Sequence, residues 1–203
     1  MSHFIYEEND FIDNELCDKI IKKFDEDDKE ENMKCDFDDM NDLNIFKRNI
    51  NKLNILDITL RVNRCEEWKN IDKTLNDKLG DAIIRYENKT SYFNINIFTN
   101  NIKNDWGYTI YKYEKNKDFF NWHIENLNYY AYNRIILYTF IIFLNDIDKG
   151  GEINFLFAKI KPKRGKILIY PSDWYFINKS EISKSNDKYI ITGNIGIVMQ
   201  ETI

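Results

Sequence analysis

The second half of this 203-residue chain repeats one pattern, in which short stretches rich in Ile, Tyr and Phe are separated by turn-forming sequences. Apolar and polar residues alternate within the stretches, as expected when successive side chains of a strand point to opposite faces. The predicted strands are Tyr108–Tyr113, Phe119–Glu125, Ile135–Leu144, Glu152–Phe157, Lys159–Lys161, Ile167–Tyr170, Trp174–Ile177, Tyr189–Thr192 and Ile195–Met199. Short strands at this spacing favour an antiparallel jelly roll or barrel.

Two amphipathic helices are predicted before these strands. The first is Phe11–Phe24, in which Asp13 or Asn14 can cap the helix and apolar residues recur on one face. Glu66–Tyr86 carries a second apolar stripe. Between them, residues 25–42 are nearly all charged and are predicted to form a solvated, mobile acidic loop, with acidic binding as the alternative. The sequence thus predicts one domain over residues 1–203, of the α+β class but mainly β, with the helices packed outside.

Composition excludes several classes of protein. A formal charge of -5 argues against broad nucleic-acid binding, which requires clustered Lys and Arg. Cys17, Cys35 and Cys65 are odd in number and lack metal-ligand spacing, so we expect a reducing compartment and no disulfide framework. The N-terminus does not resemble a signal peptide, and no apolar run approaches the roughly 18 residues of a membrane span. We therefore expect a soluble, cytoplasmic protein.

One pair of residues has the spacing of metal ligands. His123 and Glu125 are two apart on a predicted strand, so their side chains point to the same face and can meet one ion. The other histidine, His3, lies near the N-terminus. Farther along, Asn178 stands ten residues before Lys188.

A series of motifs, taken in order, carries a resemblance to a known family. They are Phe11-Ile12-Asp13-Asn14-Glu15-Leu16-Cys17-Asp18, Tyr113 with Phe119-Phe120-Asn121-Trp122-His123-Ile124-Glu125, Phe143-Leu144-Asn145-Asp146 with Gly150-Gly151-Glu152 and Phe155, Lys161-Pro162-Lys163-Arg164-Gly165-Lys166, Tyr170-Pro171-Ser172-Asp173-Trp174, and Lys188-Tyr189-Ile190-Ile191-Thr192. Over nearly its whole length the chain resembles the Fe(II)- and 2-oxoglutarate-dependent dioxygenases, in the prolyl 4-hydroxylase-like branch. That resemblance implies a double-stranded β-helix core.

The resemblance also implies roles for five residues. His123 and Glu125 would be the first two Fe(II) ligands, and Asn178 occupies the place of the third. Lys188 would pair with the distal carboxylate of 2-oxoglutarate, and Tyr113 would donate a hydrogen bond to the same co-substrate. Each role has a structural alternative. Lys188 would be a solvated lysine at a strand end, Tyr113 a core tyrosine whose hydroxyl is satisfied, and His123 a buried histidine satisfied by hydrogen bonds.

Two of these positions depart from the family pattern. Glu125 replaces an aspartate, which keeps the oxygen donor but lengthens the side chain by one methylene. Asn178 replaces a histidine, and an amide oxygen is a far poorer ligand for Fe(II) than an imidazole nitrogen. Three outcomes stay open: Asn178 binds iron weakly, Asp173 or Glu181 takes its place, or the site holds no metal.

Two functions therefore compete. The first is a dioxygenase that uses Fe(II) and 2-oxoglutarate, with ascorbate as a further cofactor, to hydroxylate a C–H bond of a peptidyl substrate, prolyl included, or of a small molecule. The second is a catalytically degenerate binding or assembly module, motivated by Asn178. A nucleic-acid demethylase on the same fold gains nothing from an acidic chain. Substrate selection is expected in the loops 88–105 and 126–133, near the mouth of the barrel.

Overall fold

The computed structural model describes residues 2–31, 54–57, 65–90, 104–125 and 134–198. Its largest element is a six-stranded antiparallel sheet in the order β1-β8-β5-β10-β3-β2. The bounds are β1 Tyr6–Glu8, β2 Asn54–Asp57, β3 Asn104–Tyr113, β5 Arg134–Phe143, β8 Ile167–Pro171 and β10 Lys188–Val198. The long strands β3, β5 and β10 were expected from the alternation of apolar and polar residues, and they lie next to one another within this sheet.

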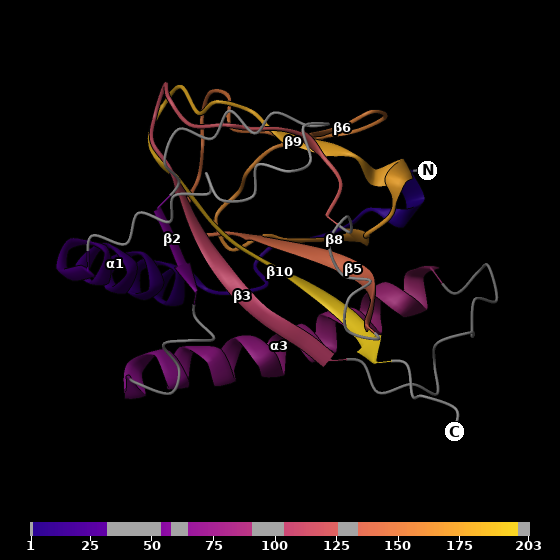
Figure 1. Cartoon of the computed structure of the whole chain (residues 1–203), viewed down its shortest axis with the longest axis horizontal. Coiled ribbons are helices and arrows are strands. Elements are labelled where there is room, and N and C mark those ends of the chain that lie inside the picture. Colours follow the sequence, from indigo (N-terminus) through magenta and orange to yellow (C-terminus); the bar gives the residue numbers. More distant parts are fainter. Residues whose placement is uncertain (1, 32–53, 58–64, 91–103, 126–133, 199–203) are drawn as a thin grey trace.

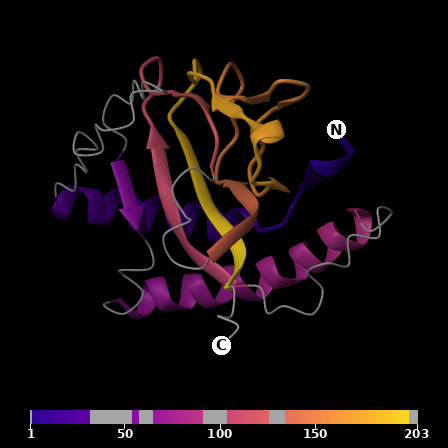
Figure 2. The same ribbon diagram turned by 45° about the vertical axis from the view of Figure 1, so that its right-hand side comes forward.

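A second, four-stranded antiparallel sheet has the order β4-β9-β6-β7. Its strands are β4 Phe120–His123, β6 Ile153–Phe155, β7 Lys159–Ile160 and β9 Asn178–Ser180. Figures 1 and 2 show this sheet on one side of the large sheet, with α1 and α3 on the other side. The fold-class prediction, mainly β with helices packed outside, is confirmed.

The two helices form where local signals and an apolar face coincide. Helix α1 (Asn14–Glu31) follows Asp13, whose side chain accepts a hydrogen bond of 2.8 Å from the backbone N–H of Leu16. Helix α3 spans Glu66–Thr90 and buries one apolar stripe, as predicted. Neither helix, nor the short 3-10 turn η1 (Ser2–Phe4), is both long and apolar enough to cross a membrane.

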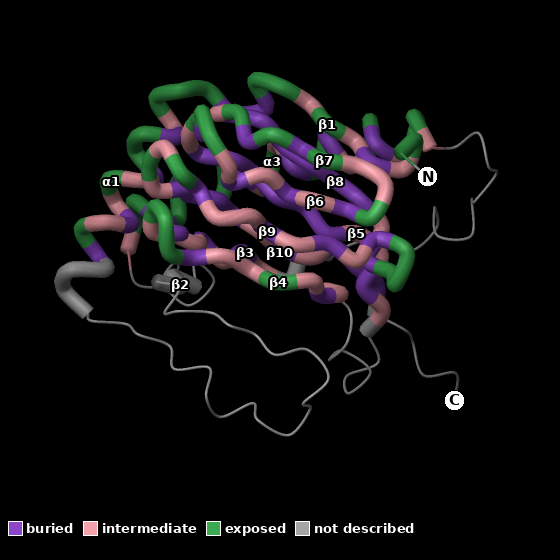
Figure 3. Tube along the Cα trace, turned by 90° about the horizontal axis from the view of Figure 1, so that it is seen from above, coloured by how far each residue is buried: buried purple, intermediate pink, exposed green. Residues whose placement is uncertain are grey.

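Alternation along the strands divides the buried residues into two cores. Figure 3 colours each described residue by how far it is buried. Phe140 and Ile142 face the helices, together with α1 and α3 residues such as Trp68. The intervening Ile141 and Phe143 face the small sheet. Strands β5 and β8 lie inside the large sheet and are covered on both faces, so their sequences are apolar at nearly every position. The inter-sheet core also contains Tyr113, Ile153, Phe155, Leu168, Tyr170, Phe176 and Ile190.

The predicted acidic loop 25–42 is wrong at its start, because α1 continues to Glu31. Charged residues extend the helix here since they find partners. Asp27 accepts hydrogen bonds of 2.7 Å from Lys23 Nζ and 2.7 Å from the buried Trp68 Nε1. Residues 32–42 lie outside the described part of the chain.

A second correction concerns the segment that leads to Asn178. The predicted strand Trp174–Ile177 is a 3-10 turn, η6 (Trp174–Phe176), capped by the Asp173 side chain, which accepts a 2.8 Å hydrogen bond from Tyr175 N–H. Strand β9 then starts at Asn178.

At the C-terminal end, the two strands predicted around Gly193 are one strand, β10. Pairing with β3 and β5 on both sides carries the strand through an irregularity between Gly193 and Ile195. Strands β1 and β2 were not predicted at all.

Candidate active site

The first two predicted metal ligands lie together at the end of β4. His123 Nε2 is 2.9 Å from Glu125 Oε1, and His123 Nδ1 is 2.8 Å from the backbone carbonyl of Asn121. A carbonyl oxygen can only accept, so Nδ1 carries a hydrogen and Nε2 is the nitrogen that faces the carboxylate. A histidine that ligates a metal is usually oriented in this way, with its other nitrogen bonded to a backbone carbonyl.

The short contact between His123 and Glu125 needs a proton or a cation between the two atoms. With a hydrogen on Nδ1 alone, the Nε2 lone pair would face a carboxylate oxygen, and the contact would be repulsive. A proton held between the two atoms, or a cation shared by both, makes it attractive. Two ligand atoms at adjacent corners of an octahedron, each about 2.1 Å from the ion, lie about 3 Å apart. The observed separation of 2.9 Å therefore fits a shared divalent cation.

Asn178 lies beside this pair because β4 and β9 are neighbours. Their register pairs the Cα atoms of His123 and Asn178. The Asn178 side chain is buried, and its Nδ2 lies 3.3 Å from the Phe176 carbonyl and 3.3 Å from the Tyr170 hydroxyl. The structure thus brings the predicted third position next to the first two, with an amide where the family pattern has an imidazole.

The two other carboxylates considered for the third position are engaged elsewhere. Asp173 caps η6 on the exposed surface. Glu181 pairs with Lys179 at 2.6 Å and accepts a hydrogen bond from Asn154 at 2.7 Å. Within the described ranges, no three His, Cys, Asp or Glu side chains form a metal-binding group. The candidate metal donors therefore stay those that the sequence predicts, His123, Glu125 and Asn178.

Lys188, at the start of β10, is fully buried in the described structure. Its Nζ donates to the Gly151 carbonyl at 3.1 Å and to the Ser180 hydroxyl, and it lies 4.2 Å from the centroid of the Tyr113 ring. No carboxylate of the described residues forms an ion pair with it; Glu152 and Glu181 act only at longer range. Burial lowers the pKa of Lys188 from 10.5 to about 7, against the opposing effect of those two carboxylates.

Tyr113 accompanies Lys188 because the two residues are register partners across β3 and β10. Both side chains lie on the inter-sheet side, and burial raises the pKa of the Tyr113 hydroxyl well above its ordinary value. Ser180 is a third member of this group that sequence reasoning missed. It stands two residues after Asn178 on β9, so strand periodicity places both side chains on the same face.

Comparison with known proteins agrees with this arrangement. Residues 108–196, which include all five predicted site residues, match the family model of the 2OG-Fe(II) oxygenase superfamily. Over these residues the chain is similar to that superfamily. No curated protein matches the sequence.

Solved structures similar to this chain are prolyl hydroxylases. The viral collagen prolyl hydroxylase of Paramecium Bursaria Chlorella virus-1, in a 2OG complex, superposes with a TM-score of 0.63 at 16% identity, covering 96% of this chain and 97% of that one. A Pseudomonas putida prolyl-4-hydroxylase gives 0.60 at 12% identity, covering 96% and 92%. The prolyl hydroxylase from Trichoplax adhaerens, in complex with a hypoxia inducible factor peptide fragment, gives 0.66 at 14% identity, covering 97% and 84%. The fold is that of the prolyl 4-hydroxylase-like branch.

The matched segment contains one more buried polar residue, Tyr170, to which the sequence assigned no role. Its hydroxyl accepts the hydrogen bond from Asn178 Nδ2 and lies 3.5 Å from Glu125 Oε1. Burial raises the pKa of Tyr170 well above its ordinary value, so the phenol stays protonated. Alternation from Leu168 to Tyr170 indicated an inward-facing side chain, but not its partners.

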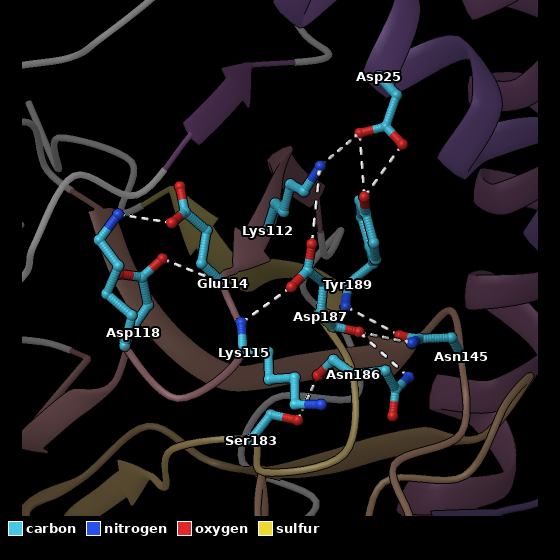
Figure 4. Close-up of polar contacts among 11 residues, drawn as sticks. Asp25, Lys112, Glu114, Lys115, Asp118, Asn145, Ser183, Asn186, Asp187 and Tyr189 are labelled. Carbon is cyan, nitrogen blue, oxygen red and sulfur yellow. Dashed lines mark hydrogen bonds and ion pairs between the residues drawn. The ribbon is translucent and has the colours of Figure 1, made fainter.

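The start of β10 is held by a polar network that includes Asn145, Asp187 and Tyr189 (Figure 4). Asn145 accepts a 2.9 Å hydrogen bond from the Tyr189 backbone N–H and donates one of 2.8 Å to the Asp187 carbonyl. On the opposite face of the strand, the Tyr189 hydroxyl donates to Asp25 at 3.0 Å. Because both neighbours of Lys188 are fixed, its side chain is directed between the sheets.

Proposed function

We propose that this protein is an Fe(II)- and 2-oxoglutarate-dependent dioxygenase that hydroxylates a C–H bond of a peptidyl or small-molecule substrate. The observation that carries the proposal is Lys188, a fully buried ammonium with no ion-pair partner in the described structure. A buried cation is costly unless an anion compensates it. A carboxylate of 2-oxoglutarate would supply that anion, in the same inter-sheet core that holds Tyr113 and Tyr170.

The predicted site residues would bind two groups, the metal and the co-substrate. His123, Glu125 and Asn178 would hold the metal, which when bound supplies O2 activation coupled to oxidative decarboxylation of 2-oxoglutarate to succinate. Lys188 would bind the distal carboxylate, and Tyr113 would orient it by a hydrogen bond. The surrounding apolar side chains exclude water and so strengthen both contacts.

A peptidyl substrate is the finer part of the proposal. It is supported by the solved neighbours, of which one is a collagen prolyl hydroxylase and another is bound to a peptide fragment. Of the predicted recognition loops, residues 88–90 belong to α3 and residues 104–105 belong to β3, which narrows the first loop. Residues 91–103 and 126–133 lie outside the described residues. Ascorbate as a cofactor and a cytoplasmic location stay predictions.

The second candidate function is a binding or assembly module on the same fold. It is favoured by Asn178, whose amide nitrogen already has two hydrogen-bond partners in the protein. Such a module would keep the Lys188 anion site without the metal.

Anaerobic titration separates the two functions. Fe(II) added with 2-oxoglutarate to the dioxygenase should produce the visible charge-transfer band of the chelate, and admitting O2 should then yield succinate. A band that forms only after Asn178→His would support the module instead. Lys188→Met is the matched control for the co-substrate site and should lose 2-oxoglutarate binding. Failure of the parent protein to bind 2-oxoglutarate would refute the role of Lys188 in the dioxygenase and in the binding module alike.

A further inference from the structure

The orientation of the Asn178 amide is fixed by its partners. The Phe176 carbonyl can only accept a hydrogen bond, so the atom of Asn178 that lies 3.3 Å from it must be the nitrogen. The same nitrogen lies 3.3 Å from the Tyr170 hydroxyl. Both N–H groups of the amide therefore have acceptors, and the side-chain oxygen is the end left for another partner.

The Tyr170 hydroxyl can accept from Asn178 because its own hydrogen has a separate acceptor. Glu125 Oε1 lies 3.5 Å away, and a carboxylate oxygen only accepts. The hydrogen bonds therefore run in one direction, from Asn178 to Tyr170 to Glu125. One phenol contacts both an amide and a carboxylate that are candidate metal ligands.

The Tyr170 ring is held firmly enough to impose this order. It is fully buried, and it packs edge-on against Phe155 with ring centroids 4.9 Å apart. The Phe176 ring lies on another side, inclined by 28° with ring centroids 6.4 Å apart. Packing of this kind leaves the hydroxyl little freedom to move.

We propose that Tyr170 is a positioning residue that presents the amide oxygen of Asn178 to the metal. The inference rests on the proposed function, because it explains how an asparagine serves in place of a histidine. An amide nitrogen has no lone pair available for a metal ion, whereas the amide oxygen is a donor that divalent cations accept. By occupying the nitrogen, Tyr170 prevents the amide from turning its N–H groups towards the ion.

The test is Tyr170→Phe, which removes one oxygen atom and keeps the ring. Mn(II), which gives an EPR signal when free, is the metal probe, and the affinity is measured with 2-oxoglutarate present. We expect Mn(II) binding to weaken by about tenfold, the usual cost of one buried hydrogen bond. In the metal-free protein, the side-chain N–H signals of Asn178 should lose protection against hydrogen exchange.

Two controls make the result specific. Tyr138→Phe removes a hydroxyl that donates to Glu87 at 3.1 Å on the helix side of the sheet, and Mn(II) affinity should stay unchanged. In the Asn178→His background, Tyr170→Phe should weaken Mn(II) binding by less than about twofold, since an imidazole coordinates without help from an amide hydrogen bond.

The possible outcomes are distinct. Unchanged Mn(II) affinity in Tyr170→Phe overturns the positioning role and leaves the proposed function intact. An equal loss in both backgrounds also overturns it, because Tyr170 would then act through Glu125 alone. A parent protein that binds no Mn(II) at all overturns the proposed function and this inference together.

Discussion

Buried charged side chains have different kinds of partner on the two faces of the large sheet. On the helix side, Asp27 is satisfied by Lys23 and Trp68, and Asp25 by Lys112 and Tyr189. On the inter-sheet side, the buried cation Lys188 has only neutral partners in the described structure.

That contrast separates structural groups from ligand-binding groups. Paired charges on the helix side fix α1 against the sheet. A buried ammonium without an anion lowers stability and gains from a bound carboxylate. The comparison therefore predicts that mutations on the two faces have opposite effects on stability.

The largest expected effect is a pH dependence caused by Lys188. Its pKa is 10.5 ordinarily and about 7 in the folded protein. Between these values the unfolded chain binds the proton and the folded chain does not, so stability rises with pH. We expect this group to increase the free energy of unfolding by up to about 4 kcal/mol between pH 7 and pH 10. Urea unfolding of the ligand-free protein at several pH values, with Lys188→Met as the variant lacking this increase, measures it.

Lys188→Met should weaken 2-oxoglutarate binding by about 100-fold, because the co-substrate carboxylate loses its charged partner. The same substitution should raise the free energy of unfolding at pH 7 by about 1–3 kcal/mol, since it removes a buried charge. Calorimetric titration and urea unfolding give the two numbers. If the variant binds 2-oxoglutarate with the same affinity as the parent protein, Lys188 is not a ligand-binding group, and the contrast with the helix-side charges fails.

On the helix side, Asp27→Ala should lower the free energy of unfolding by about 2 kcal/mol. The indole N–H of the buried Trp68 and the ammonium of Lys23 would lose their shared acceptor. Urea unfolding measures the loss, and 2-oxoglutarate affinity should not change. An increase in the free energy of unfolding in Asp27→Ala would mean that the buried charges on the helix side lower stability, as Lys188 does, and the contrast between the two faces would fail.

Exposed ion pairs give the smallest effect. Glu66 lies 3.8 Å from Lys69 on the surface of α3. Removing this pair with Glu66→Gln should change the free energy of unfolding by less than about 0.5 kcal/mol, because water screens the charges. A larger change in the same unfolding assay would show that burial is not what separates the two classes.

The sequence predicted the parts of this molecule that depend on local periodicity. Alternation located the central strands. The spacing of His123 and Glu125 predicted that their side chains meet, although β4 ends at His123 and Glu125 lies in the turn that follows, not on the predicted strand. The segment 174–177 was predicted incorrectly, because its apolar residues suit a strand but a side-chain cap from Asp173 closes a 3-10 turn.

Contacts between distant segments were the part that local reasoning could not supply. Tyr170 meets Asn178 and Glu125 only after β8, β9 and the end of β4 are brought together. Ser180 reaches Lys188 only across the two sheets. Likewise, charge alone suggested that α1 ends before Asp25, whereas partners from α3, β3 and β10 extend it.

The most direct measurement is a crystal structure with Mn(II) and 2-oxoglutarate, in which anomalous scattering locates the metal. The account predicts one Mn(II) bound by His123 Nε2, a Glu125 carboxylate oxygen and Asn178 Oδ1, with the distal carboxylate of 2-oxoglutarate on Lys188 Nζ. Metal bound away from these three side chains, or 2-oxoglutarate bound without contact to Lys188, would contradict it.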